Sequence, residues 1–437
     1  MKKEKNIFLN KKILIYGLGK TGISAFKFLK DKNDIFLFDD HQINSNDFLT
    51  RKKTITYSDV IKSKFDRVIL SPGIDFNKCR LSNFLKKNKK KIYSDLDVFY
   101  SFYKNDSITV TGTNGKSTTC QLLYEILSQK SFDVKLVGNI GNPILSVNNV
   151  KKKTIFVIEA SSYQLEYSKI FCSKYSAILN IAPDHLERHK TLNNYIKAKF
   201  KLIKNQPKGS LSFIKKNDLL VNKELLSNKV NHKVIKVSTT NLDNFIKKIG
   251  NEYFLNANNK ENLSFVLAIL KEFGLRSKSL IKAIKNFKGL NYRQQIIFKG
   301  PKLIIINDSK STSFSSSEGI LKLNSKIFWL LGGKPKKGDK FNLSKKYFKN
   351  IKAFIYGKNF KFFNNVLNNK IQFQNFKNLN EALKKIFFVI KKEKSKKIIL
   401  FSPCAASFDS FKNFEDRGYY FNKLVKKYLN VQKTIDL

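Results

Sequence analysis

The sequence predicts an α/β protein of three consecutive domains with mainly parallel sheets. Two glycine-rich turns, at residues 17–22 and 112–118, each follow a strand-like run and precede a helical pattern. From residue 154 onward, short apolar runs alternate with helical patterns, and the alternation restarts beyond Gly289. This order is typical of βαβ units. We expect domains over residues 1–95, 96–289 and 290–437, the first and last Rossmann-like, and a final helix that begins near Phe408.

Nothing in the chain predicts membrane insertion or export. The longest apolar runs, such as residues 303–306 and 327–331, are long enough only for buried strands. The lysine-rich residues 1–12 are not followed by the apolar stretch of a signal peptide. The isolated cysteines argue against a disulfide framework and a structural zinc site. They are Cys79, Cys120, Cys172 and Cys404. We therefore expect a cytoplasmic protein.

The formal net charge of +51 suggests nucleic-acid binding at first reading, because basic side chains neutralise phosphates. The lysines are spread over the whole chain, however, and arginine is scarce. Arginine is the residue that bidentate phosphate and base recognition favours. We interpret the charge as solvated lysine-rich faces that attract anionic substrates, and we expect no specific nucleic-acid partner.

The first domain opens with a dinucleotide-binding pattern. A strand at residues 12–16 leads into Gly17-Leu18-Gly19-Lys20-Thr21-Gly22, a helix and a second strand that ends at Asp39. GxGxxG with a later acid fits NAD, but by itself it predicts only a diphosphate or nucleotide on the helix N-terminus. A further strand, residues 67–70, precedes the loop Ser71-Pro72-Gly73-Ile74. Ligands of open α/β sheets bind at such carboxyl ends.

The central domain opens with a phosphate-binding pattern, TVTGTNGKSTTCQLLYE at residues 109–125. Glycines let backbone N–H groups converge on an anion, and the following helix N-terminus adds partial positive charge. Lys116 is expected to reach the outer phosphates and Ser117 to ligate Mg²⁺. The first glycine lies closer to the lysine than in the standard Walker pattern. We interpret this stretch as an ATP site.

Two further segments follow strands of the central domain. Glu159 ends a buried-looking strand, and an acid beside a phosphate loop can hold Mg²⁺ or simply face water. NIAPDHLERH, residues 180–189, follows the next strand and holds two of the four histidines. At that edge His185 is a candidate metal ligand, whereas a lone histidine is more often a satisfied surface or core residue.

Together, GTNGKST, EASSYQLE, NIAPDHLERH and YIKAK resemble the Mur ligase family, the ATP-dependent amide-forming enzymes of peptidoglycan precursor synthesis. Within that family SSYQLE, NDSKST at residues 307–312 and SPCAASFDSFKNFEDRG at residues 402–418 resemble the branch that adds D-glutamate. The resemblance runs from about Gly17 to Gly418, with the motifs in the family's order.

The resemblance implies an ATP site with two Mg²⁺ ions. Ser117 and Glu159 would hold one ion, and His185 and Lys199 the other. Because a lysine ammonium has no lone pair, Lys199 would act as a carbamate formed with CO2. The implied ATP contacts are Gly112, Thr113, Asn114, Gly115, Lys116, Ser117, Thr118, Asn259, Asn262, Arg293 and Asp308. The implied catalytic residues are Lys116, His185, Lys199 and Lys310.

The resemblance also implies two further substrate sites. The uridine-diphosphate substrate would meet Gly17, Lys20, Thr21, Ser71, Gly73 and Asn139. D-Glutamate would meet Thr312, Lys336, Ser407 and Phe414, with Lys334 and Lys337 as alternatives to Lys336. A dicarboxylate needs cationic and hydroxyl donors at both ends, which this set provides.

Three positions depart from the family's pattern. Where the family has the motif HNxxN, this chain has Asn258 in place of the histidine and Asn256 in place of a preceding glycine. The family's HR pair has Tyr292 before Arg293. We expect these departures to affect local loop packing rather than phosphate contacts.

The implied activity is the ATP-dependent addition of D-glutamate to UDP-N-acetylmuramoyl-L-alanine through an acyl phosphate, by a monomer. Another Mur-type amide ligase or a folylpolyglutamate synthase would share the central motifs and differ in the C-terminal pocket. An NAD-dependent oxidoreductase rests on residues 17–22 with Asp39 alone, and it leaves the second phosphate loop unexplained. A nucleic-acid-binding protein rests on charge alone.

Overall fold

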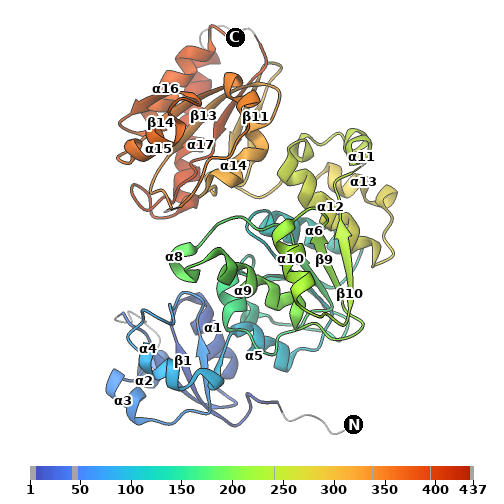
Figure 1. Ribbon diagram of the computed structural model, residues 1–437, viewed down its shortest axis with the longest axis vertical. Coiled ribbons are helices and arrows are strands. Elements are labelled where there is room, and N and C mark those ends of the chain that lie inside the picture. The colour runs from blue at the N-terminus through green and yellow to red at the C-terminus, as the bar shows by residue number, and fades with distance from the viewer. Residues whose placement is uncertain (1–5, 42–47, 241, 337, 394, 434–437) are drawn as a thin grey trace. The chain divides into compact units, whose positions relative to one another are not determined.

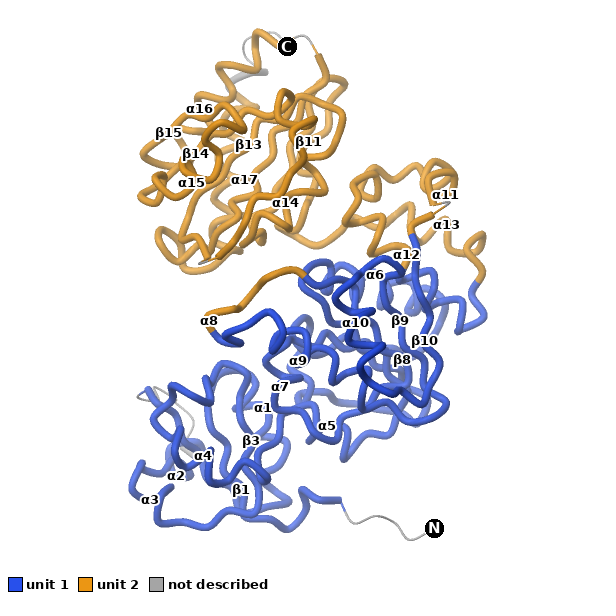
Figure 2. The backbone as a smooth tube through the Cα atoms, viewed as in Figure 1, with its two compact units in different colours: residues 1–181, 188–238, 265–275 blue, residues 182–187, 239–264, 276–437 orange. Residues whose placement is uncertain are grey.

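The computed structural model describes residues 6–41, 48–240, 242–336, 338–393 and 395–433. These residues form three sheets, each covered by helices, and the predicted α/β fold with mainly parallel sheets is confirmed (Figure 1). By compactness the chain divides into two units (Figure 2). The first comprises residues 1–181, 188–238 and 265–275, and the second comprises residues 182–187, 239–264 and 276–437. Within the described residues no helix is both long and apolar enough to cross a bilayer.

The first sheet has the parallel strand order β2-β1-β3-β4. Because β1 lies between β2 and β3, the loops after β1 and β3 meet where the strand order reverses, a position that favours ligand binding. The strands are β1 Lys12–Tyr16, β2 Asp34–Phe38, β3 Arg67–Leu70 and β4 Ile92–Tyr93. The helices are α1 Lys20–Leu29, α2 Phe48–Lys53, α3 Tyr57–Lys62 and α4 Ser82–Lys87.

The second sheet has the parallel order β10-β9-β8-β5-β7-β6, so the loops after β5 and β8 meet at its own reversal of strand order. The strands are β5 Ser107–Thr111, β6 Val134–Gly138, β7 Ile155–Glu159, β8 Tyr175–Ile178, β9 Leu211–Lys215 and β10 Lys233–Val237. The helices are α5 Asp95–Phe102, α6 Lys116–Gln129, α7 Ser162–Tyr167, α8 Leu186–His189, α9 Leu192–Lys204 and α10 Leu219–Ser227.

Three helices follow in sequence: α11 Leu242–Ile249, α12 Ala257–Lys271 and α13 Ser277–Lys285. The third sheet has the order β11-β12-β16-β13-β14-β15, in which only the β11–β12 pair is antiparallel. Its strands are β11 Gln295–Lys299, β12 Leu303–Asn307, β13 Lys326–Gly332, β14 Ile351–Tyr356, β15 Gln372–Phe376 and β16 Lys397–Phe401. Its helices are α14 Phe314–Leu321, α15 Phe360–Leu367, α16 Leu379–Ile390 and α17 Phe414–Lys433.

The prediction that the last helix begins near Phe408 is wrong. The helix begins at Phe414 because the Asn413 side chain caps it, accepting a hydrogen bond from the Asp416 amide at 2.7 Å. Strands β4, β6, β9, β10, β11 and β15 were not predicted, and all of them except β9 lie at sheet edges. The sequences of β10 and β15, KVIKV and QFQNF, carry polar residues because an edge strand has more exposed surface than a central one.

Helix α5 joins the first two sheets within the first unit. The Phe99 ring of this helix lies edge-on to Phe156 of β7, with centroids 4.8 Å apart. Asp97 of the same helix is fully buried and accepts hydrogen bonds from the backbone amides of Ser94, Lys169, Ile170 and Phe171. A buried carboxylate satisfied by so many amides holds the two backbone segments together.

We expect Asp97→Asn to destabilise the protein, because one acceptor oxygen becomes a donor that faces backbone N–H groups. The free energy of unfolding should fall by about 3 kcal/mol, the order expected for lost hydrogen bonds to a buried charge. Urea denaturation monitored by circular dichroism measures the loss. Asp31→Asn, at an exposed aspartate, is the matched control and should leave the midpoint unchanged.

Candidate functional site

The phosphate-loop pattern forms a tight turn between β5 and α6. Gly112 and Gly115 have φ of +150° and +84°, conformations that a side chain would strain. Asn180, directly after β8, anchors this turn. Its carbonyl accepts from the Thr113 amide and its Oδ1 from the Asn114 amide, both at 2.9 Å. The turn therefore lies where the second sheet reverses its strand order.

Lys116, the first residue of α6, folds back over this turn. Its Nζ donates to the carbonyls of Gly112 and Thr113, both at 2.8 Å. Both acceptors are neutral carbonyl oxygens. A phosphate bound at the turn would therefore meet a cationic side chain beside the loop.

Glu159 brings three predicted site residues together at the ends of β6 and β7. Only 1% of its surface is exposed. Its Oε2 accepts from the Ser117 hydroxyl at 2.6 Å, and its Oε1 accepts from the Asn139 amide group at 2.7 Å. The chain passes close behind it, because a Cβ at Gly138 would lie 2.4 Å from the Glu159 carbonyl oxygen. The carboxylate thus lies directly beside the phosphate loop.

The oxygen atoms of Ser117 and Glu159 fit a magnesium ion. Mg²⁺ prefers hard oxygen ligands and is usually held by one or two carboxylates together with substrate phosphates and water. Within the described residues no group of three or more His, Cys, Asp and Glu side chains could hold a metal. Ser117 and Glu159 are thus two oxygen donors that could contribute to a magnesium site beside the phosphate loop.

Lys199 lies beneath the phosphate loop on α9, with 1% of its surface exposed. Its Nζ donates to the Gly112 carbonyl at 2.9 Å and contacts the Thr111 hydroxyl at 3.3 Å. It also lies 4.7 Å from the centre of the Tyr195 ring. The sequence contains many exposed lysines, so this burial separates Lys199 from the solvated ones.

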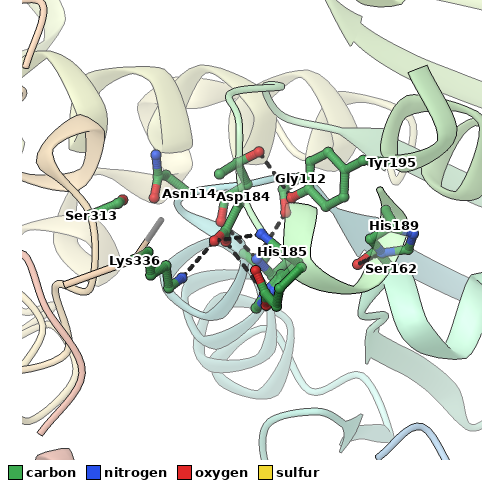
Figure 3. Close-up of polar contacts among 12 residues, drawn as sticks. Gly112, Asn114, Ser162, Asp184, His185, His189, Tyr195, Ser313 and Lys336 are labelled. Atoms are coloured by element: carbon green, nitrogen blue, oxygen red, sulfur yellow. Dashed lines mark hydrogen bonds and ion pairs between the residues drawn. The ribbon is translucent and has the colours of Figure 1, made fainter. Parts of the chain in front are cut away.

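His185 has a φ of +55°, and its ring lies between two carboxylates. Nε2 is 3.4 Å from Asp184 and Nδ1 is 3.5 Å from Glu187. Asp184 also binds Lys336, whose Nζ is 2.5 Å from Oδ1 (Figure 3). His185 and Lys199 belong to different compact units, so their pairing at one metal stays a prediction.

In the first domain, the two loops predicted for the uridine-diphosphate substrate meet at the reversal of strand order. The Ser71 hydroxyl donates to the Gly17 carbonyl at 2.5 Å, and a Cβ at Gly22 would lie 1.9 Å from the same oxygen. Asp39, the acid of the NAD-like pattern, accepts from the Leu18 amide at 2.6 Å. Of the remaining predicted residues, Lys20 and Gly73 are exposed and Thr21 is half-buried.

Arg188, which sequence reasoning missed, joins the loop after β3 to Tyr167 of α7. Its side chain is 7% exposed, and Nη2 donates to the Ile74 carbonyl at 2.6 Å and to the Tyr167 hydroxyl. Tyr167 itself donates to Ile74 at 3.1 Å. The only sequence signal for Arg188 is that arginine is rare here, with seven among 84 basic residues.

The asparagines predicted for adenine lie at the start of α12 and are nearly buried. Asn259 and Asn262 are each 2% exposed, and Asn259 donates to the Tyr253 carbonyl at 2.9 Å. Asn256, one of the departures from the family pattern, accepts from the Asn259 amide at 2.9 Å and so caps the helix. Asn258 donates to the Ser316 carbonyl at 3.2 Å.

The third sheet gathers several predicted residues around Phe414. Lys310 Nζ lies 3.9 Å from the centre of its ring, and the Arg293 guanidinium lies 5.9 Å away. Ser407 is 3% exposed and Thr312 is half-buried. Among the candidate lysines for D-glutamate, Lys336 is half-buried, Lys334 is exposed and Lys337 lies outside the described residues.

Asp308 is a buried carboxyl at the end of β12. Burial raises its pKa to about 7, although a hydrogen bond from Ser402, the Gln294 amide and the charges of Arg293 and Arg417 oppose that rise. The Ser402 hydroxyl lies 2.9 Å from Oδ2 and the Gln294 amide 3.1 Å from Oδ1. The group can therefore change its charge near neutral pH.

Comparison with known proteins gives a consistent result. Residues 110–276 match the Mur ligase middle domain. The chain is 34% identical to a UDP-N-acetylmuramoylalanine–D-glutamate ligase of Rickettsia felis, covering 97% of this chain and 98% of the relative. It is 36% identical to that of Rickettsia prowazekii, with 97% and 99% covered. The structure of the MurF ligase from Thermotoga maritima in complex with ADP aligns with a TM-score of 0.60, at 14% identity, over 98% and 100% of the two chains.

The raised pKa of Asp308 predicts a pH-dependent stability. The folded chain holds a proton on Asp308 up to about pH 7, whereas an unfolded aspartate, with a pKa of 3.8, has already lost it. The resulting stability is full below the unfolded pKa and is lost as pH rises through the folded one. Asp308→Asn cannot titrate at this position and should not lose this stability. The unfolding free energy of the variant minus that of wild type should therefore rise by about 2–3 kcal/mol from about pH 5 to about pH 8.5. Urea titrations at both pH values measure it, and a constant difference between the proteins would contradict the expectation.

Proposed function

The chain belongs to the Mur ligase family, ATP-dependent amide ligases of peptidoglycan synthesis, and we propose that it joins D-glutamate to UDP-N-acetylmuramoyl-L-alanine. The observation that carries this proposal is the arrangement of Lys116, Ser117 and Glu159 around one phosphate loop. It is supported by relatives of that activity that match almost the whole chain, including the C-terminal domain in which Mur ligases of different amino-acid specificity would differ.

The reaction we propose has two steps. The L-alanine carboxylate of the nucleotide-sugar substrate attacks the γ-phosphorus of ATP, which breaks the bond to ADP and gives an acyl phosphate. The D-glutamate amine then attacks that carbonyl, loses a proton and expels phosphate, which leaves an amide. A free carboxylate cannot acylate an amine, because its leaving group would be an oxide, whereas phosphate leaves readily.

The cationic side chains of the site answer the main electrostatic difficulty of the first step, the approach of a carboxylate to a polyphosphate. Lys116 would hold the outer phosphates, and Arg293 would meet the γ-phosphate. The nucleoside part of ATP would be bound by Asn259, Asn262 and Asp308. Mg²⁺ bound by Ser117 and Glu159 would supply positive charge at the phosphate oxygens. Preorganised charges of this kind are effective because they need no rearrangement as the reaction proceeds.

Lys199 and His185 are proposed for a second Mg²⁺. In the observed form the Lys199 ammonium donates to the Gly112 carbonyl and has no lone pair with which to ligate a cation. Carbamylation by CO2 would replace that ammonium with an oxygen ligand of negative charge. The near-complete burial of Lys199 beside the phosphate loop supports this role.

The three domains would each supply one substrate site. Residues 1–95 would bind the uridine-diphosphate part through Gly17, Lys20, Thr21, Ser71 and Gly73, with Asn139 beside the reacting carboxylate. Residues 96–289 would bind ATP. Residues 290–437 would bind D-glutamate through Thr312, Lys336, Ser407 and Phe414, with Lys310 nearby as a catalytic cation. Domain closure would exclude water from the acyl phosphate.

The proposal includes a monomeric enzyme in the cytoplasm. Isolated cysteines support a reducing compartment, since the four described cysteines are free thiols. High net charge disfavours self-association at low salt. The NAD-dependent alternative loses support, because the Asp39 carboxylate already accepts hydrogen bonds from Leu18 and His41 of its own domain.

The decisive test is ADP release in the presence of UDP-N-acetylmuramoyl-L-alanine and a panel of D- and L-amino acids. We expect release to require both the nucleotide sugar and D-glutamate, and Lys116→Ala to lower it by at least about 100-fold. Lys152→Ala, at an exposed loop lysine, is the matched control. Release that is equally fast with another amino acid would replace D-glutamate by that substrate, and release that persists in Lys116→Ala would contradict the assigned ATP site.

The carbamate role of Lys199 predicts a dependence on bicarbonate. In CO2-depleted buffer, wild-type activity should rise when bicarbonate is added, and ¹³C-bicarbonate should give a carbamate resonance in the NMR spectrum. Lys199→Ala should lose at least about 100-fold in rate and show neither response. Lys197→Ala, an exposed lysine on the same helix, should behave as wild type. A wild-type protein without the resonance would rule out the carbamate.

A further inference from the structure

Arg417, in the first turn of α17, is a fully buried cation. Within the described residues its guanidinium forms no ion pair; Nε and Nη2 donate to neutral oxygens of Ser309 and Ala405, and Nη1 is buried without a hydrogen-bond partner beside Tyr356. Burying a charge is costly unless hydrogen bonds satisfy it. Arg417 is therefore not a solvated surface charge. The contacts that hold Arg417 therefore indicate what it does.

The guanidinium joins loops that follow different strands of the third sheet. Nε donates to the Ser309 hydroxyl at 3.1 Å and Nη2 to the Ser309 carbonyl at 2.6 Å, in the loop after β12. Nη2 also donates to the Ala405 carbonyl at 3.0 Å, in the loop after β16. One planar fork thus fixes two backbone segments that are almost 100 residues apart in sequence.

The loop after β13 closes against the same guanidinium. A Cβ at Gly333 would lie 3.1 Å from Arg417 Nη1 and 2.5 Å from the Ala406 carbonyl oxygen. Lys334 and Ala406 exchange backbone hydrogen bonds of 2.9 Å in both directions. Gly333, with a φ of +124°, is required here both by conformation and by space.

These three loops and the start of α17 carry every residue assigned above to D-glutamate. Thr312 follows Ser309, Lys336 follows Gly333 and Ser407 follows Ala405. Phe414 begins α17, and its carbonyl accepts from the Ser309 hydroxyl at 2.9 Å. Ser309 therefore links Arg417 to Phe414, the fourth residue assigned to D-glutamate, as well.

The charge of Arg417 acts on the groups around it. Burial raises the pKa of Tyr356 to about 12, and the nearby Arg417 charge opposes that rise. The same charge lowers the pKa of Asp308 against the effect of its burial. A positive potential at the ends of these strands favours an anionic ligand at the loops that follow them.

The composition of the chain agrees with a need for a guanidinium. Only seven of 84 basic residues are arginine. Two of them, Arg188 and Arg417, are more than nine-tenths buried, and both donate to backbone carbonyls of distant loops. A lysine carries the same charge but cannot present several donors in one fixed plane.

We propose that Arg417 is a positioning residue that sets the amino-acid pocket by tying together the loops after β12, β13 and β16. Its charge then favours a dicarboxylate over a neutral amino acid. The identity of the amino acid rests on the proposed function, whereas the ordering of the loops does not.

The test compares the full-length wild-type chain with Arg417→Lys, which keeps the charge and loses the fork. We expect the KM for D-glutamate to rise about tenfold or more, with KM for ATP and for the nucleotide sugar within about twofold of wild type. Hydrogen exchange of the substrate-free protein should increase together in residues 309–312, 333–336 and 405–407. Arg276→Lys, at an exposed arginine, should change neither readout.

A milder variant keeps the test informative if Arg417→Lys folds poorly. Ser309→Ala removes one acceptor of Arg417 and should give a smaller rise in the same KM. An unchanged KM for D-glutamate in both variants would overturn the proposal, as would an equal rise in all three KM values with faster exchange throughout the third sheet. If the wild type releases no ADP with any amino acid, the proposed function fails, and the substrate-free exchange experiment still decides the role of Arg417.

Discussion

Glu159 is a carboxylate with 1% of its surface exposed, and its oxygens accept hydrogen bonds from two different segments, Ser117 of α6 and Asn139 after β6. The arrangement of the candidate ATP site depends on these bonds. They place the hydroxyl predicted for Mg²⁺ and the amide predicted for the sugar substrate on one buried acid. Strand β7 lies between β5 and β6 and is parallel to both. The carboxyl ends of the three strands therefore lie at the same edge of the sheet. The parallel sheet therefore brings the loops after these strands together, and the Glu159 carboxylate holds Ser117 and Asn139 in place there.

Much of this arrangement could be predicted from the sequence because the phosphate loop is a local feature. Strand, turn and helix occupy consecutive residues from Ser107 to Gln129, and the glycines that allow the turn are visible in the motif. The edge strands β10 and β15 could not be found in the same way, since their polar residues hide the apolar pattern. Helix α17 was placed too early because its start depends on a single side chain, Asn413.

Arg188 and Arg417 escaped prediction for a different reason. Their partners include backbone carbonyls of loops remote in sequence, and since a carbonyl belongs to every residue, no motif records those contacts. Only the rarity of arginine in a lysine-rich chain marks them, and burial is needed to separate them from the other five. Both join segments that lie far apart in the sequence. In this chain, then, the fork of a guanidinium serves tertiary organisation more than surface charge.

Two of the residues that depart from the family pattern, Asn258 and Tyr292, lie against glycines. A Cβ at Gly319 would lie 2.8 Å from Asn258 Cγ, and a Cβ at Gly418 would lie 2.3 Å from the Tyr292 ring. Each replaced residue therefore packs against a glycine that has no side chain to obstruct it. The neighbouring Asn259 donates a hydrogen bond to the Tyr253 carbonyl, and the Arg293 guanidinium lies 5.9 Å from the centre of the Phe414 ring. Asn258 and Tyr292 thus fill space that only a glycine leaves open, which is an effect on local packing, and the retention of the nucleotide contacts stays a prediction.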